Sequence, residues 1–111
     1  IMMLGFFRKK KRTLLDELND VTVKMYRPLL VNNKKVSDEK ILEVVQTTMR
    51  AFTQAAESKG EKISGNVLMK ISAKFICVYD MSGQEFFLEH LKYEINKYLT
   101  EGLRPEYQQN A

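Results

Sequence analysis

His90 and Glu94 are the two residues of this sequence whose types and spacing could best support chemistry. Side chains four positions apart share one face of a helix, so the pair could supply two ligands of a metal ion. A metal centre needs further ligands, and the Glu-x-x-His pair typical of di-iron bundles is missing because position 87 is phenylalanine. We therefore expect His90 to be solvated or hydrogen-bonded, and we predict no metal site and no cofactor.

Cys77 is the only cysteine, so the chain cannot form a disulfide within itself. It lies in an apolar run, where a buried and unreactive thiol is expected. Cys77 and His90 fall on different predicted helices, and no other feature indicates a thiol activated by an imidazole. The sequence also has no glycine-rich phosphate loop and no cluster of Cys and His. We predict that the protein is not an enzyme.

The densest charge lies near the N-terminus, where five consecutive residues are basic: Arg8, Lys9, Lys10, Lys11 and Arg12. Without these five, thirteen basic residues face fourteen acidic ones, so the formal charge of +4 is local. With Phe6 and Phe7 beside it, the cluster could bind an anionic membrane, at about 1 kcal/mol per basic residue. It could also bind nucleic acid phosphates. The interpretation we favour is a solvated arm at residues 1–12.

Four aromatic residues could line a small-molecule cavity between helices: Phe75, Tyr79, Phe86 and Tyr98. An apolar cavity of this kind needs few polar groups, so it would leave no recognisable motif in the sequence. A bundle that binds a small molecule is therefore one alternative function, and association with nucleic acid or an anionic membrane through the basic arm is another.

The clearest helix signal lies in residues 81–102. Ser82 is expected to be the N-cap and Glu85 to complete a capping box, so that two otherwise unpaired backbone amides are satisfied. Apolar residues then recur at steps of three and four along one face. Gly102 can end the helix in a left-handed conformation, and Pro105 prevents an early restart. This pattern predicts a helix over residues 83–101.

Three earlier segments carry similar helix signals. Ser37 and Ser64 are each bracketed by apolar residues, one before the cap and one four positions after it, as in a hydrophobic staple. Thr13 begins an amphipathic pattern that Pro28 should end. These signals predict helices over residues 13–27, 37–59 and 65–80. In the first of them, one face carries Leu14, Leu18, Val21 and Met25.

Residues 67–81 fit two patterns, because their apolar side chains recur at helical spacing but also alternate as in a strand. We favour the helix, since Ser64 caps it and no other segment could pair with a strand and satisfy its backbone.

The folded part is predicted to be one all-α domain. A chain of 111 residues with 44% apolar residues is the size of a single domain and can bury a core. We expect a small bundle of about four helices over residues 13–102, which a second copy could complete. Residues 103–111 are expected to form a loosely held tail.

Self-association is the kind of function that the composition favours. The chain has six methionines, and we expect Met25, Met49 and Met69 to fill the core. Beyond Phe75, however, the predicted helix is apolar nearly all round, so a patch could remain that a second copy covers. We predict a non-enzymatic helical interaction protein that forms a homodimer.

A cytoplasmic location is the expectation from three features. No apolar run approaches the roughly 18 residues needed to span a bilayer. The first apolar residues precede the basic cluster, which is the reverse of the order in a secretory signal. A single cysteine also fits a reducing compartment.

Overall fold

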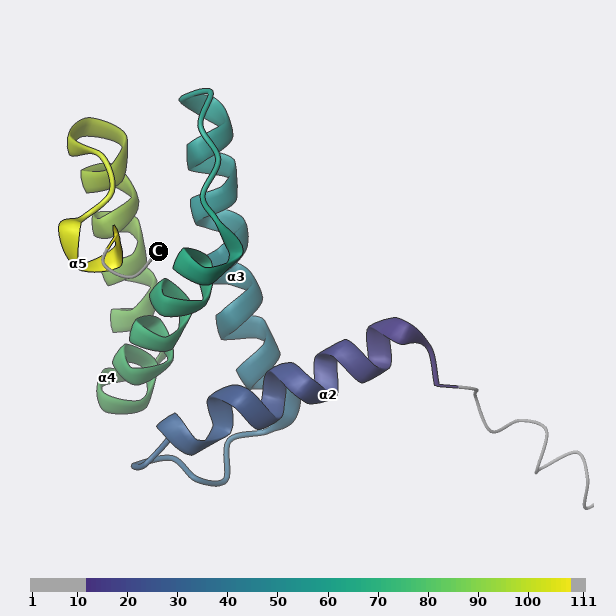
Figure 1. The fold of residues 1–111 in the computed structure, drawn as a ribbon. Coiled ribbons are helices and arrows are strands. Elements are labelled where there is room, and N and C mark those ends of the chain that lie inside the picture. Colours follow the sequence, from purple (N-terminus) through teal and green to yellow (C-terminus); the bar gives the residue numbers. More distant parts are fainter. Residues whose placement is uncertain (1–11, 109–111) are drawn as a thin grey trace, which may run out of the picture.

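The computed structural model of the protein describes residues 12–108, and every regular element in that range is helical. The elements are α2 (Leu14–Tyr26), the 3₁₀ turn η1 (Arg27–Leu29), α3 (Asp38–Ser58), α4 (Gly65–Glu101) and α5 (Pro105–Gln108), drawn in Figure 1. The prediction of a small all-α bundle is confirmed. Residues 67–81 lie within α4, so the helical interpretation of that segment was right.

Helices α3 and α4 begin where their capping residues predict. The Ser37 hydroxyl accepts a hydrogen bond from the Lys40 backbone N–H at 3.1 Å. The Ser64 hydroxyl accepts one from the Val67 backbone N–H at 3.2 Å. Each hydroxyl satisfies a backbone donor that has no partner within its helix.

Gly83 divides α4 into two halves, residues 65–82 and 84–101, that fold back on each other. Its φ of 89° and ψ of −178° are not helical, and Figure 1 shows the green ribbon reversing direction there. Only glycine adopts this conformation without strain. The predicted tight turn between two helices is therefore present, but the predicted start at Ser82 is wrong. Residue 82 is still helical, and the backbone breaks at Gly83.

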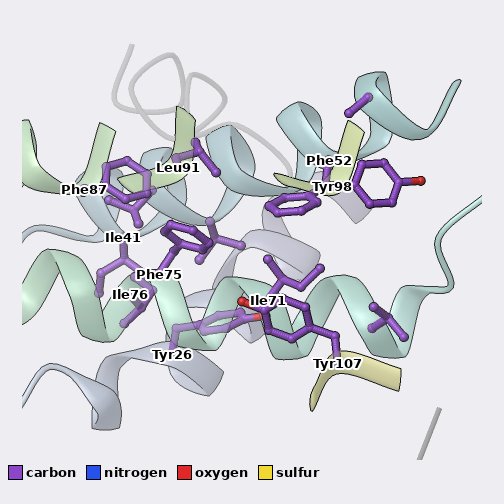
Figure 2. Close-up of a cluster of buried hydrophobic side chains, with 14 of the residues drawn as sticks. Tyr26, Ile41, Phe52, Ile71, Phe75, Ile76, Phe87, Leu91, Tyr98 and Tyr107 are labelled. Carbon is purple, nitrogen blue, oxygen red and sulfur yellow. The ribbon is translucent and has the colours of Figure 1, made fainter. Parts of the chain in front are cut away.

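The core lies between α3 and the two halves of α4. Phe52, Phe75 and Phe87 are almost completely buried, and Figure 2 shows them among the other core side chains. The Phe75 ring centroid lies 6.4 Å from that of Phe52 and 6.0 Å from that of Phe87. Each such side chain contributes about 1.5–3 kcal/mol when it is buried. This aromatic contact holds the folded-back halves of α4 against α3.

Asp80, near the end of the first half of α4, binds the loop of residues 30–37 that connects η1 to α3. Its side chain is buried and accepts hydrogen bonds from the backbone N–H groups of Asn32 and Asn33, at 3.0 and 2.8 Å. The side-chain amides of both asparagines donate to it as well. Burial opposes the negative charge, but these donors outweigh it and hold the pKa of Asp80 below its usual value.

The segment after Gly102 is packed against the bundle, which corrects the expectation of a loosely held tail for residues 103–108. Tyr107 on α5 is only 4% exposed. Arg104, just before α5, places its Nη2 atom 2.9 Å from Glu94 Oε2 in α4. The last three residues of the predicted tail, 109–111, lie outside the described part of the chain.

Candidate interaction surface

Helix α2 begins with a complete capping box. The Asp16 backbone N–H donates to Thr13 Oγ1 at 3.1 Å, and the Thr13 backbone N–H donates to Asp16 Oδ2 at 3.0 Å. The Arg12 guanidinium also pairs with Asp20, one turn beyond Asp16. Local contacts therefore define the start of α2, without help from the rest of the protein.

The N-terminal half of α2 projects away from the bundle (Figure 1). All of residues 12–18 are exposed, whichever side of the helix they occupy. Only the C-terminal half is anchored, because Val23 and Tyr26 are buried and the Tyr26 hydroxyl donates to the Met69 carbonyl oxygen at 3.3 Å. The helix is thus held at one end and presents its other end to solvent.

An apolar stripe runs along the outer side of α2 at spacings of four, three and four residues. It consists of Leu14, Leu18, Val21 and Met25, whose exposed fractions are 71%, 53%, 57% and 45%; we call it the α2 stripe. Helices normally turn such a face toward a partner. The α2 stripe faces solvent because the opposite face, with Val23 and Tyr26, contacts the bundle.

An apolar hollow of about 400 Å³ adjoins the end of the α2 stripe at Met25. It is lined by Met25, Tyr26, Leu29, Asn66, Met69, Lys70 and Ala73, from α2, η1 and the first half of α4; we call it the Met25 hollow. Met25 and Met69 were expected in the core, but both are exposed at its edge, at 45% and 38%. Of the three methionines assigned to the core, Met49 alone is partly buried against it.

The residues with potential for chemistry meet around Glu94, whose side chain is only 2% exposed. Its Oε2 atom lies 2.9 Å from Arg104 Nη2, 3.4 Å from Lys74 Nζ and 3.8 Å from His90 Nε2. Tyr107 is next to this cluster, and burial together with Glu94 raises the pKa of its hydroxyl. Three basic groups thus surround one buried carboxylate, an arrangement that joins both halves of α4 to the C-terminal segment.

His90 and Glu94 lie close together as their spacing predicted, but they are part of the larger cluster around the Glu94 carboxylate. The His90 ring also stacks between Phe86 and Tyr93, with centroid distances of 5.9 and 6.2 Å. Among residues 12–108, no three His, Cys, Asp or Glu side chains are placed to hold a metal ion. Cys77 is partly buried, not fully buried as expected.

The four aromatic residues predicted to line a cavity are divided between core and surface. Phe75 and Tyr98 are buried at 0% and 3% exposure, and Phe86 is 49% exposed. Tyr79 is partly buried and packs its ring against Phe87 at a centroid distance of 6.4 Å. None of the four lines the Met25 hollow.

Most of the predicted anion-binding cluster lies outside the described residues, namely Arg8, Lys9, Lys10 and Lys11. Arg12 is described, and its guanidinium pairs with Asp20.

Within residues 12–108, no helix combines the length and the apolar character required to cross a membrane.

Sequence reasoning missed two clusters, the one around Glu94 and the one around Asp80. In both, a partner is distant in sequence: Lys74 is 20 positions from Glu94, and Asn32 is 48 positions from Asp80. Asp80 itself could have indicated its cluster, since it is an acidic residue within an apolar run. A carboxylate that is buried there must accept hydrogen bonds from donors elsewhere in the chain.

Comparison of the chain with protein-family models, with curated proteins and with solved structures gives no match. The function is therefore inferred from the surface and the charges described above.

Proposed function

We propose that this protein is a non-enzymatic binding protein that self-associates through the α2 stripe, as a homodimer. One observation carries the proposal: an apolar stripe of helical spacing is 45–71% exposed on a helix whose opposite face already contacts the bundle. Two-fold symmetric dimers use the same patch on both copies, so the α2 stripe of one copy could cover the α2 stripe of the other.

The length of α2 gives a reason for pairing. Its 13 residues are near the lower limit at which an isolated helix persists in water. The side chains in its first half are not buried against the bundle, since residues 12–18 are all exposed. Pairing with a second helix would remove apolar surface from water along the whole length of α2 and stabilise its projecting half.

The α2 stripe alone would support a weak dimer. Half-burying four side chains from each copy contributes about 6–12 kcal/mol, if full burial contributes about 1.5–3 kcal/mol for each. Association itself costs roughly 4–15 kcal/mol in lost freedom of motion. Because the two ranges overlap, a tight dimer would need contacts in addition to the α2 stripe.

The Glu94 cluster supports a structural role for the residues that could otherwise perform catalysis. The Glu94 carboxylate is buried, and its nearest basic neighbours are the side chains of Arg104, Lys74 and His90. These groups are occupied with one another, and they hold the end of the chain against α4. The binding surface is therefore proposed on α2.

The test is the mass of the full chain in solution, measured by sedimentation equilibrium over a concentration series. We expect the mass to rise from that of the 13.0 kDa monomer to twice that value. Leu18→Glu should shift this transition to much higher concentration, because it places a charge in the middle of the α2 stripe. Glutamate is a good helix former, so a weaker dimer would not be explained by a lower helix propensity at position 18.

Leu88→Glu is the matched control, because Leu88 is 44% exposed but lies on α4. It should dimerise like the wild type. A wild-type chain that stays monomeric throughout the series would contradict the proposal, and so would a Leu18→Glu variant that dimerises as well as the wild type.

A further inference from the structure

Two charged residues accompany the α2 stripe on the same flank. Successive residues of a helix turn by about 100°, so Glu17 and Lys24 both lie roughly 70–90° to one side of the stripe. Leu15 and Thr22 lie at similar angles on the other side. Glu17 and Lys24 are both exposed, and neither takes part in an ion pair within residues 12–108.

The orientation of two paired helices decides which flanks meet. In an antiparallel pair, each flank lies beside the same flank of the other helix, and the first turn of one helix lies beside the last turn of the other. Glu17 of each copy therefore comes beside Lys24 of the other. In a parallel pair, this flank faces the opposite one, and Glu17 would meet the uncharged side with Thr22. Charged residues at these flanking positions are known to set helix orientation. The charges on α2 favour the antiparallel pair.

The Met25 hollow points to the same orientation. It lies on the Leu15 flank, beside the last turn of α2, where Met25, Tyr26 and Leu29 form part of its lining. An antiparallel pair brings the first turn of the other copy to this place. Leu15, which is 64% exposed, would then enter the hollow of the other copy.

A second copy also fits this surface better than an anionic membrane does. Asp16, Glu17 and Asp20 place three carboxylates on the projecting half of α2, where Arg12, paired with Asp20, is the one basic residue among residues 12–20. Anionic lipid would repel them, whereas the last turn of another α2 offers Lys24 as a basic partner.

We propose that two copies of this chain pair their α2 helices antiparallel, with Glu17 of each beside Lys24 of the other and Leu15 of each in the Met25 hollow of the other. This inference rests on the proposed self-association through the α2 stripe and adds the orientation of the two copies. It also supplies the additional contacts that a tight dimer requires.

Charge reversal tests the orientation. Glu17→Lys gives a copy with two lysines on the flank, and Lys24→Glu gives a copy with two carboxylates. Each variant alone should dimerise roughly tenfold more weakly than the wild type at low salt, because two attractive contacts become repulsive. An equimolar mixture of the two should restore the affinity through a heterodimer, and the double variant Glu17→Lys/Lys24→Glu should restore it in a homodimer.

Leu15→Ala tests the hollow. Alanine is the best helix former, so a weaker dimer would reflect the lost side chain and not a damaged helix. We expect a several-fold loss of affinity, and no loss for the control Leu88→Ala.

The outcomes separate this inference from the proposed function. If the wild type dimerises and Leu18→Glu abolishes the dimer, but both charge reversals associate like the wild type, the antiparallel arrangement is wrong and self-association through α2 stands. If single reversals weaken the dimer but neither the mixture nor the double variant restores it, the Glu17–Lys24 contact is likewise wrong. If the wild type is monomeric, both fail.

Discussion

Arg104 Nη2 lies 2.9 Å from Glu94 Oε2, and this contact joins the segment after α4 to a carboxylate that is only 2% exposed. The same oxygen has Lys74 Nζ at 3.4 Å on the first half of α4. One buried charge thus connects three stretches of the chain. Arg104 is the member of the cluster that comes from beyond the end of α4, so its contact with Glu94 ties the segment leading into α5 to α4.

Arg104→Ala should lower the free energy of unfolding by about 1–2 kcal/mol. This is below the roughly 3–5 kcal/mol for breaking a fully buried ion pair, because the Arg104 side chain is 37% exposed and solvent screens it. Tyr107 should become accessible as α5 is released. Urea unfolding and tyrosine fluorescence quenching measure the two effects. Arg50→Ala, an exposed site on α3, is the control; equal losses for both variants would refute a special role for Arg104.

Asp80→Ala should lower the free energy of unfolding by about 2–4 kcal/mol at neutral pH, because it leaves the donors of Asn32 and Asn33 without their acceptor. The folded-state pKa of Asp80 lies below its usual value. Its contribution is therefore present above about pH 3.9, the pKa of an unfolded aspartate, and is lost as the pH falls through the folded-state pKa.

Urea unfolding at neutral pH and at about pH 3 gives the comparison for Asp80. The difference between wild type and Asp80→Ala should shrink in acid. Glu89→Ala, at an exposed site, should differ little from the wild type at either pH. A difference for Asp80→Ala that is the same at both pH values would show that the carboxylate charge is not what holds the loop.

Three of the four predicted helix starts are correct because they depend on near neighbours, whereas the start predicted at Ser82 is not, since the backbone breaks at Gly83. Thr13, Ser37 and Ser64 each cap a helix through an amide three positions later. Whether the apolar face of a helix points into the core or toward solvent could not be predicted in the same way. The α2 stripe and the apolar face of α3 have similar spacing, yet Ile41 is fully buried and Leu14 is 71% exposed.

The difference between these two faces arises from the tertiary arrangement. Val23 and Tyr26 on the other side of α2 contact the bundle, so the α2 stripe faces away from it. The donors to Asp80, and Lys74 beside Glu94, likewise come from residues that are distant in sequence. Local patterns therefore predicted the elements of the fold, whereas the candidate surface depends on contacts that no single segment contains.

Gly83→Ala should lower the free energy of unfolding by about 1–3 kcal/mol, the cost of a side chain at a φ of 89°. No side chain or backbone from elsewhere in the described chain lies within 4 Å of the position that its Cβ would take, so the loss would come from backbone strain. Gly65→Ala is the matched control, since Gly65 is helical and its Cβ would also meet nothing. That change should be neutral or slightly stabilising. Equal thermal midpoints for the two variants would refute the strained turn.

Tyr98→Phe should reduce the loss of stability at alkaline pH. Burial, followed by the hydrogen bond that its hydroxyl donates to Glu61 Oε1 at 2.7 Å, raises the pKa of Tyr98 to about 12. An unfolded tyrosine has a pKa of about 10. Between these values the Tyr98 hydroxyl is ionised in the unfolded chain but still protonated in the folded one. The contribution of Tyr98 to the free energy of unfolding is therefore fully present below about pH 10 and falls as the pH rises toward about 12.

The slope of unfolding free energy against pH above about 10 measures this effect. Tyr98→Phe should have a shallower slope than the wild type, even though losing the bond to Glu61 makes it less stable at neutral pH by about 1 kcal/mol. Tyr93→Phe, at a side chain that is 51% exposed, is the control for removing any tyrosine hydroxyl. If the two variants flatten the slope equally, the burial of Tyr98 is not the cause of the alkaline instability.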